Sequence, residues 1–179
     1  MKKQKKKAKY KKIPGRSFWS KRNIVIFIIS TFLVFIIYFL FLRDPDGSHF
    51  KKEGEVTFID KFSRQHRKEI DVEVANNNTE RMQGLMYRRH MDEDNGMLFI
   101  FEHPDMQSFW MKNTILPLDI MFIDSTGVID TIYRNTTPYS EKSLPSRRRV
   151  QFVVEVNGGW SDKNAVKEGD LIEFKVDRK

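Results

Sequence analysis

The stretch Ile70-Asp71-Val72-Glu73-Val74 sets the class of the fold, because its apolar and acidic residues alternate with a period of two. Neighbouring side chains of a strand point to opposite faces, so this pattern predicts a half-buried strand with one wet face. The same period returns in 150–156 (VQFVVEV) and in 172–176 (IEFKV). The segment 97–101 (MLFIF) is apolar throughout, which predicts a central strand covered on both faces.

Turn and helix signals complete a mostly β (α+β) pattern. The segments 120–123 and 128–133 flank 124–127 (DSTG), a connection with hairpin chemistry. One helix is predicted from about Thr79 to Arg89, and a second, shorter turn would be capped by Ser161. Asn78 or Thr79 would cap the first helix, with Met82, Leu85, Met86 and Arg89 on one side. The whole is typical of a compact β sandwich or small barrel with one or two short helices.

An uncharged run at 24–42 (IVIFIISTFLVFIIYFLFL) precedes this domain. As a helix rising ~1.5 Å per residue it would be roughly 28 Å long, close to the hydrocarbon thickness of a bilayer. Ser30 and Thr31 can return their hydroxyl hydrogen bonds to the preceding turn, which suits burial in lipid. No small-residue cleavage pattern follows at 43–46 (RDPD), so we expect a retained single-pass anchor over 23–43 and not a cleaved signal peptide.

Residues 1–22 form a basic tail. They hold 11 of the 32 basic residues and no acidic residue, which leaves 21 basic against 24 acidic residues in the remainder. The positive-inside bias places this tail in the cytoplasm and the C-terminal part outside it. The charge therefore indicates a lipid bilayer as partner and not nucleic acid. We expect an inner (cytoplasmic) membrane protein with a tether at 44–54 and a β-rich extracytoplasmic domain at 55–179.

Several kinds of chemistry are disfavoured by composition. The chain has no cysteine, which excludes a disulfide scaffold, a thiol enzyme and a Cys-ligated metal. Its histidines lack the short spacing that presents two rings to one ion, and no phosphate-binding glycine motif occurs. No metal site and no cofactor are therefore predicted; the histidines in question are His49, His66, His90 and His103.

A set of sequence blocks resembles the bacterial and archaeal family called domain of unknown function 192. The blocks follow the family's order over most of the outer domain, and the anchor lies outside them. The resemblance implies a compact, jelly-roll-like β fold, and it implies no activity and no functional residue. The blocks are 81–88 (RMQGLMYR), 96–99 (GMLF), 109–114 (FWMKNT), 117–120 (PLDI), Glu155, 159–160 (GW) and 169–170 (GD).

The block FWMKNT is the first candidate binding site. If it is a strand, Trp110, Lys112 and Thr114 share one face, while Phe109, Met111 and Asn113 share the other. A lysine beside a tryptophan would suit a polar ligand with an apolar ring, such as a sugar. The alternative is structural, with Trp110 in the core, Lys112 extending past it and Asn113 capping a turn.

Charged residues within the family blocks are the second candidate. These residues are Arg81, Arg88, Asp119 and Glu155, and if they converge with Lys112 they would hold a carboxylate, phosphate or sugar. Alternatively, Arg81 pairs with Asp119 or Glu155 and locks the helix onto the sheet. Asp119 with Glu155 is also the one carboxylate pair that we would test for glycosidase geometry.

These observations favour a membrane-anchored, extracytoplasmic and non-catalytic module that binds a small polar ligand or an envelope component such as a saccharide. The ligand-binding residues would be Arg81, Trp110, Lys112, Asn113, Asp119 and Glu155. Two alternatives stay open. One is an envelope-saccharide hydrolase or transferase that uses Asp119 and Glu155, and the other is a structural or assembly module that docks another protein.

Overall fold

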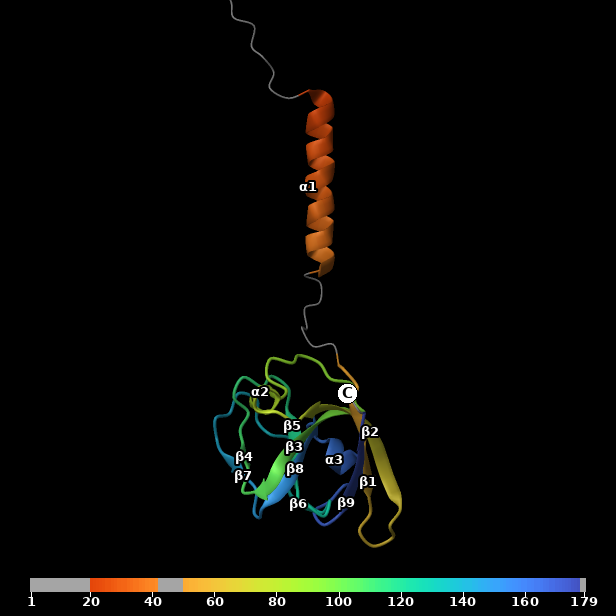
Figure 1. Cartoon of the computed structure of the whole chain (residues 1–179), viewed down its shortest axis with the longest axis vertical. Coiled ribbons are helices and arrows are strands. Elements are labelled where there is room, and N and C mark those ends of the chain that lie inside the picture. The colour runs from red at the N-terminus through yellow and green to blue at the C-terminus, as the bar shows by residue number, and fades with distance from the viewer. Residues whose placement is uncertain (1–19, 42–49, 178–179) are drawn as a thin grey trace, which may run out of the picture. The chain divides into compact units, whose positions relative to one another are not determined.

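The computed structural model of the chain describes residues 20–41 and 50–177 (Figure 1). The chain divides into two units between Pro45 and Asp46, and each is described by itself. Most of the basic tail and most of the tether lie outside the described residues.

The first unit contains one helix, α1 (Lys21–Phe41). Two of its hydroxyl groups are satisfied within the helix, because Ser30 Oγ and Thr31 Oγ1 each donate to the Phe27 carbonyl oxygen at 2.9 Å. Its length and apolar composition are sufficient to cross a membrane. The apolar run is therefore helical, as its composition predicts.

The second unit is built on a seven-stranded sheet with the order β6-β5-β8-β3-β2-β1-β9. Strands β2 and β3 pair in parallel, and the other neighbours pair antiparallel. Two short strands, β4 (Ser108–Phe109) and β7 (Leu144–Pro145), form a separate ladder. The strands of the large sheet are β1 (Gly54–Ile59), β2 (His66–Ala75), β3 (Asn95–Asp105), β5 (Leu118–Ile123), β6 (Ile129–Tyr133), β8 (Val150–Asn157) and β9 (Leu171–Val176).

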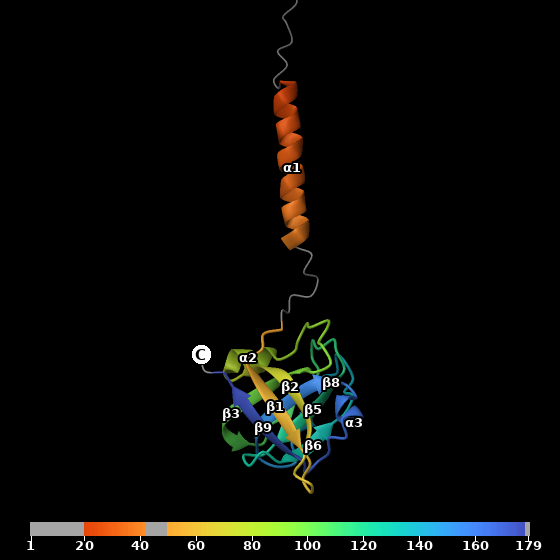
Figure 2. The same ribbon diagram turned by 90° about the vertical axis from the view of Figure 1, so that its right-hand side faces the viewer.

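The large sheet curls until its two edges meet. Ile172 N donates to Gly127 O at 2.8 Å and Ile129 N donates to Asp170 O at 2.9 Å, which joins the entry of β9 to the entry of β6. In Figure 2, β1 and β9 accordingly lie in front of β5 and β8. The prediction of a compact, mostly β fold is confirmed.

The curled sheet has two buried faces. All seven strands contribute to the inner core, which includes Phe58, Leu98 and Val154. The outer core covers only the middle strands and includes Phe99 and Phe122. In Figure 1, α2 (Asn78–Gln83), β4 and β7 lie on this outer side, away from β1 and β9. The two faces therefore have different neighbours.

Most strand predictions are confirmed, with one correction. The segments 70–74 and 172–176 are strands, MLFIF lies in the central strand β3, and 120–133 is the β5–β6 hairpin. The strand β8 is covered on both faces, because Val153 and Glu155 are buried as well as Val154. The expectation of a wet face for this strand is wrong, since its alternation is broken by the pair Val153-Val154.

The helix predictions are partly wrong. The helix α2 ends at Gln83, because Gly84 turns the chain away with a φ of 47°. Its cap is Asn77, whose side chain accepts from Glu80 N at 3.0 Å. Ser161 lies inside the short helix α3 (Trp160–Lys163) and does not cap it.

Candidate functional site

The segment after β4 is a loop and not the predicted strand. Met111 N donates to Ser140 O at 2.9 Å and Thr114 N donates to Met111 O at 3.1 Å, which curls the chain. Met111 and Thr114 are buried, whereas Trp110 is 47% exposed. The predicted alternation of faces is therefore wrong, since the backbone of this segment bonds to loops and to itself instead of to a neighbouring strand.

Two neighbouring loops hold this segment through their backbones. Tyr87 N donates to Asn113 O at 2.8 Å, and Tyr139 N donates to Thr114 O at 3.1 Å. The side chains of both tyrosines stay in solvent, with 64% of Tyr87 and 62% of Tyr139 exposed. We call Tyr87, Trp110, Lys112 and Tyr139 the aromatic loop surface.

Two residues of these loops have strained backbones. Tyr87 and Tyr139 have φ values of 64° and 59°, in the left-handed region that bulky side chains rarely adopt. Asn113 has a φ of 56°, which asparagine adopts more readily. Such strain persists where surrounding contacts fix the backbone, and it concentrates at ligand-binding sites. The backbone hydrogen bonds just described supply those contacts.

Lys112 is available for a ligand. Its Nζ lies 4.9 Å from the centroid of the Trp110 ring and 3.8 Å from Glu141 Oε1. All three side chains are substantially exposed, so neither contact contributes much to stability. Asn113 is less free, because its amide nitrogen lies 3.9 Å from Met86 Sδ.

Asp119 is a structural residue of the inner face. Its carboxylate accepts from Asn135 N at 2.6 Å, Gly159 N at 2.9 Å and Ser161 N at 2.8 Å, and also from the Ser161 hydroxyl. The side chain is fully buried. These bonds join β5 to α3 and to the loop after β6, so we call them the Asp119 lock.

Glu155 lies on the opposite face of the sheet from Asp119. The β5–β8 register pairs Ile120 with Glu155 and Asp119 with Val156. Because directly paired residues of an antiparallel ladder share a face, Asp119 points inward and Glu155 outward. The two carboxyl groups do not face one cavity, and the glycosidase pair that we considered is not formed.

The Glu155 carboxyl is buried without a partner. The residue is 5% exposed, and its neighbours across the ladders are Met97 and Ile120. Within the described part of the chain, no donor or cation contacts its oxygens. Burial raises the pKa of Glu155 to about 8, so the carboxyl is mainly protonated at neutral pH.

Arg81 does not pair with Asp119 or Glu155, so the ion pair that we considered is not formed. Its guanidinium donates to Ile100 O at 2.7 Å, Asn76 O at 3.0 Å and Asn78 Oδ1 at 2.7 Å, and lies over the Phe101 ring. The helix α2 is thus held to β3 through a backbone carbonyl. Arg81 has a structural role.

Arg88 was among the charged candidates from the sequence, but the ion pair that it forms was missed. Arg88 pairs with Glu73 on β2, and both side chains are almost completely buried. The alternation of 70–74 places Glu73 on one face of its strand, but it contains no signal for Arg88 as partner. The partner comes from a loop that only the fold brings to β2.

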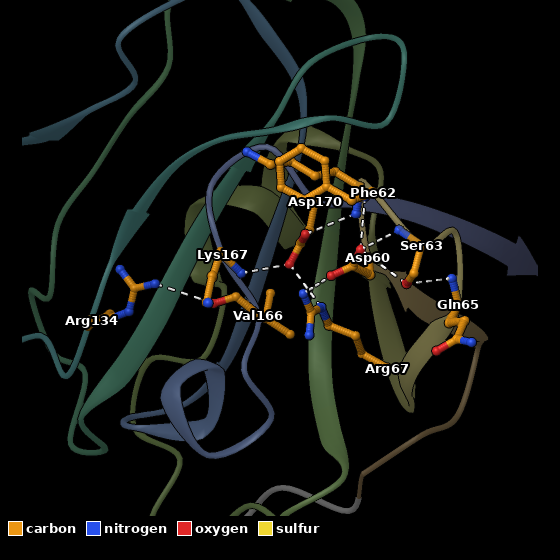
Figure 3. Close-up of polar contacts among 10 residues, drawn as sticks. Asp60, Phe62, Ser63, Gln65, Arg67, Arg134, Val166, Lys167 and Asp170 are labelled. Carbon is orange, nitrogen blue, oxygen red and sulfur yellow. Dashed lines mark hydrogen bonds and ion pairs between the residues drawn. The ribbon is translucent and has the colours of Figure 1, made fainter.

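Another charge cluster, in which Asp170 is buried, lies at the turn between β1 and β2 (Figure 3). Asp170 accepts from Lys61 N at 3.1 Å and Lys167 N at 2.9 Å and contacts Arg67 Nε at 3.1 Å. Asp60 accepts from Ser63 N and Phe62 N, and these bonds hold the pKa of Asp60 at about 2. Because both carboxylates have full sets of partners, this cluster is structural.

In residues 20–41 and 50–177, no group of three or more His, Asp or Glu side chains is arranged to hold a metal ion.

Comparison with known proteins identifies one family and several solved structures. The model of the DUF192 family, described as an uncharacterized ACR, matches residues 60–174. A crystal structure from Sinorhizobium meliloti 1021, of a protein provisionally described as a transcription regulator, is 42% identical. The match covers 71% of this chain and 96% of that one, with a TM-score of 0.66.

A protein of unknown function from Novosphingobium aromaticivorans DSM 12444 is also similar. It is 35% identical over 66% of this chain and 83% of its own length, with a TM-score of 0.63. No curated protein matches the chain.

Proposed function

The chain belongs to the DUF192 family, and from this premise we propose that it is a non-catalytic binding module held at a membrane by α1. The observation that carries the proposal is the aromatic loop surface. Three aromatic rings and one lysine stand in solvent on loops whose backbones are fixed by mutual hydrogen bonds. A rigid, exposed aromatic set costs little entropy when a ligand binds.

The chemistry of this surface suits a saccharide of the cell envelope. Apolar ring faces of Trp110, Tyr87 and Tyr139 can pack on the C–H faces of sugar rings, while the tyrosine hydroxyls and the Lys112 ammonium bond to oxygen. Trp110, Lys112 and Asn113 are the binding candidates from the sequence that lie in this loop. Arg81 and Asp119 serve the structure instead.

The proposed location is supported by α1 and by the basic residues before it. The basic residues before α1 favour a cytoplasmic N-terminus, which directs the β domain to the outer side of the cytoplasmic membrane. A C-terminal alkaline phosphatase fusion should then be active, and a C-terminal fusion that is active only as a cytoplasmic reporter would contradict this orientation.

Nucleic-acid binding has less support. The description of the Sinorhizobium meliloti protein names transcription regulation, but residues 23–179 of this chain carry 21 basic against 24 acidic residues. DNA-binding surfaces need a local excess of Lys and Arg to neutralise phosphate. Lys112 is the single basic residue among the four that define the aromatic loop surface, and it also contacts Glu141.

The proposal is tested by titrating the full chain in detergent with soluble envelope saccharides. We expect Trp110→Ala and Lys112→Ala each to weaken binding tenfold or more, because each removes a direct contact. The matched control is the pair Lys61 and Phe62, where Nζ lies 4.7 Å from an exposed ring at the β1–β2 turn. Phe62→Ala and Lys61→Ala should leave affinity unchanged.

Equal affinity of the Trp110→Ala variant and the unaltered chain, with both folded by circular dichroism, would overturn the proposal. Loss of folding in Lys112→Ala would instead show that the lysine is structural.

A further inference from the structure

Glu141 is an acidic neighbour of Lys112 at the aromatic loop surface. Its Oε1 lies 3.8 Å from Lys112 Nζ, which is within the range of an ion pair but too long for a hydrogen bond. Both side chains are substantially exposed. Exposed pairs of this kind stabilise a protein only weakly, so a carboxylate of a ligand can replace Glu141 at Lys112 with little loss of stability.

The backbone on either side of Glu141 is fixed beside the loop that contains Lys112. Ser140 O accepts from Met111 N at 2.9 Å, and Lys142 N donates to Ser140 Oγ at 3.3 Å. The backbone therefore holds the Glu141 carboxylate within reach of Lys112, while the exposed side chain is free to turn into solvent. Glu141 thus occupies the position that the carboxylate of a ligand would take.

The charges around this pair favour an anion. Lys142 follows Glu141 directly and is exposed, and no carboxylate in residues 20–41 and 50–177 lies within ion-pair distance of it. Lys112, Glu141 and Lys142 together contribute two positive charges and one negative charge. Binding of one anion therefore brings this part of the surface closer to neutrality.

Two hydroxyl groups lie on the same loops. Ser108 Oγ is 2.7 Å from Ser143 Oγ, and both residues are exposed. Ser143 directly precedes β7 and Trp110 directly follows β4, and these two strands pair with each other. Because hydroxyl groups both donate and accept hydrogen bonds, the serine pair suits the hydroxyl groups of a sugar that packs on Trp110.

We infer that the ligand of the aromatic loop surface is an acidic saccharide, whose carboxylate displaces Glu141 from Lys112 while its sugar ring packs on Trp110. This inference rests on the proposed function and names the class of saccharide. Lys112 Nζ lies 4.9 Å from the centroid of the Trp110 ring, so a sugar on that ring has the ammonium group at its edge. The single charge of a carboxylate matches one ammonium group, and a carboxylate is the group that Lys112 already contacts.

Glu141 then acts as an internal competitor for acidic ligands. In the free protein its carboxylate partly neutralises Lys112, and an acidic ligand must displace it. A neutral saccharide carries no group that competes with Glu141. Removal of the Glu141 charge should therefore raise the affinity for acidic saccharides alone, by about two- to fivefold, which corresponds to the strength of an exposed ion pair.

The test titrates the full chain in detergent with cellobiouronate, a disaccharide that carries one carboxylate, and with cellobiose, its neutral counterpart. We expect cellobiouronate to bind about tenfold more tightly, because a hydrogen bond between charged groups is stronger than one to a hydroxyl group. Lys112→Gln should remove this preference, since it removes the charge and keeps a hydrogen-bond donor. Glu141→Gln should tighten cellobiouronate binding about two- to fivefold and leave cellobiose binding unchanged.

The matched control is Glu93→Gln, the same change in another exposed ion pair, with Lys163 of α3, and it should alter neither affinity. The basic tail is present in every variant, so its attraction for an anion cancels in these comparisons. A preference for cellobiouronate that persists in Lys112→Gln would overturn the inference, as would an unchanged cellobiouronate affinity in Glu141→Gln.

Two further outcomes separate this inference from the proposed function. Equal affinities for the two disaccharides, both weakened by Trp110→Ala, would overturn the acidic class and leave the proposed function supported. Absence of cellobiouronate binding would also overturn the inference, whereas the proposed function is tested by the titration of Trp110→Ala with envelope saccharides.

Discussion

Asp119 and Glu155 lie on the neighbouring strands β5 and β8 and are both buried, yet their surroundings differ. Asp119 points to the inner face and accepts hydrogen bonds from three backbone N–H groups and a hydroxyl. Glu155 points to the outer face and has no partner in the described part of the chain. A carboxyl group is therefore ionised and fully hydrogen-bonded on one face, and buried with a raised pKa and no partner among the described residues on the other.

This difference reflects the different surroundings of the two faces of the sheet. The inner face is enclosed by all seven strands, and its polar groups serve to fix loops and α3. The outer face is covered by α2 and by loops, which include the aromatic loop surface. Loops on a rigid scaffold commonly carry binding residues, and these loops lie on the outer face.

The largest expected effect is on the inner side. Asp119→Ala should lower the free energy of unfolding by about 3 to 5 kcal/mol, because it removes a buried acceptor from the N–H groups of Asn135, Gly159 and Ser161. Urea denaturation of the full chain measures this change. Asp162→Ala, at an exposed ion pair with Arg134, should cost less than about 1 kcal/mol. Equal losses for the two variants would remove the contrast between buried and exposed carboxylates.

The second effect concerns pH. The folded-state pKa of Glu155 is raised to about 8, above that of the unfolded chain, so its neutral form stabilises the fold most at acidic pH. As the pH rises from about 4.5 to about 8, stability should fall by at most about 1.4 kcal/mol per pH unit, and then level off. Glu155→Gln should remove this slope. If the free energy of unfolding depended on pH in the same way for the unaltered chain and for Glu155→Gln, the pKa of Glu155 would not be raised by folding.

A smaller effect tests the cover of the outer face. Asn77→Ala removes the cap of α2 and should cost about 1 kcal/mol. Because a looser α2 admits water above Glu155, the pKa of Glu155 should move down toward its ordinary value. Comparing unfolding curves of this variant at acidic and alkaline pH measures both changes. If Asn77→Ala lowered stability but left the pH dependence of the free energy of unfolding unchanged, α2 would not shield the Glu155 carboxyl group from water.

The smallest effect is expected at the aromatic loop surface. Trp110→Ala should change the free energy of unfolding by about 1 kcal/mol or less, since the ring is half exposed. A decrease in the free energy of unfolding comparable to that of Asp119→Ala would show that Trp110 stabilises the fold, as in the structural alternative for this segment.

The strands were predictable because burial imposes a period on them. The alternation at 70–74 and the continuous apolar run at 97–101 each identify a strand whose place in the sheet the structure confirms. The end of α2 was missed because Leu85 and Met86 continue a helical period, while the left-handed turn at Gly84 interrupts it. Gly84, a glycine within this apolar pattern, was the one sign in the sequence that the helix could end there.

The sites were less predictable because register and loop contacts decide them. Nothing in the spacing of Asp119 and Glu155 shows that their strands pair one residue out of phase, which sends the carboxyl groups to opposite faces. Similarly, 109–114 has the pattern of a strand, but its backbone bonds go to the loops that contain Tyr87 and Tyr139. Trp110 and Lys112 were identifiable from their chemistry, and their exposure required the fold.

The division between the two faces is tested most directly by the carbon-13 chemical shift of the Glu155 side-chain carboxyl, followed by nuclear magnetic resonance from about pH 4 to pH 10 and assigned with Glu155→Gln. We expect the signal to remain that of a protonated acid at neutral pH and to titrate near pH 8. A titration midpoint between about pH 4 and 5 would contradict a buried, unpartnered carboxyl group.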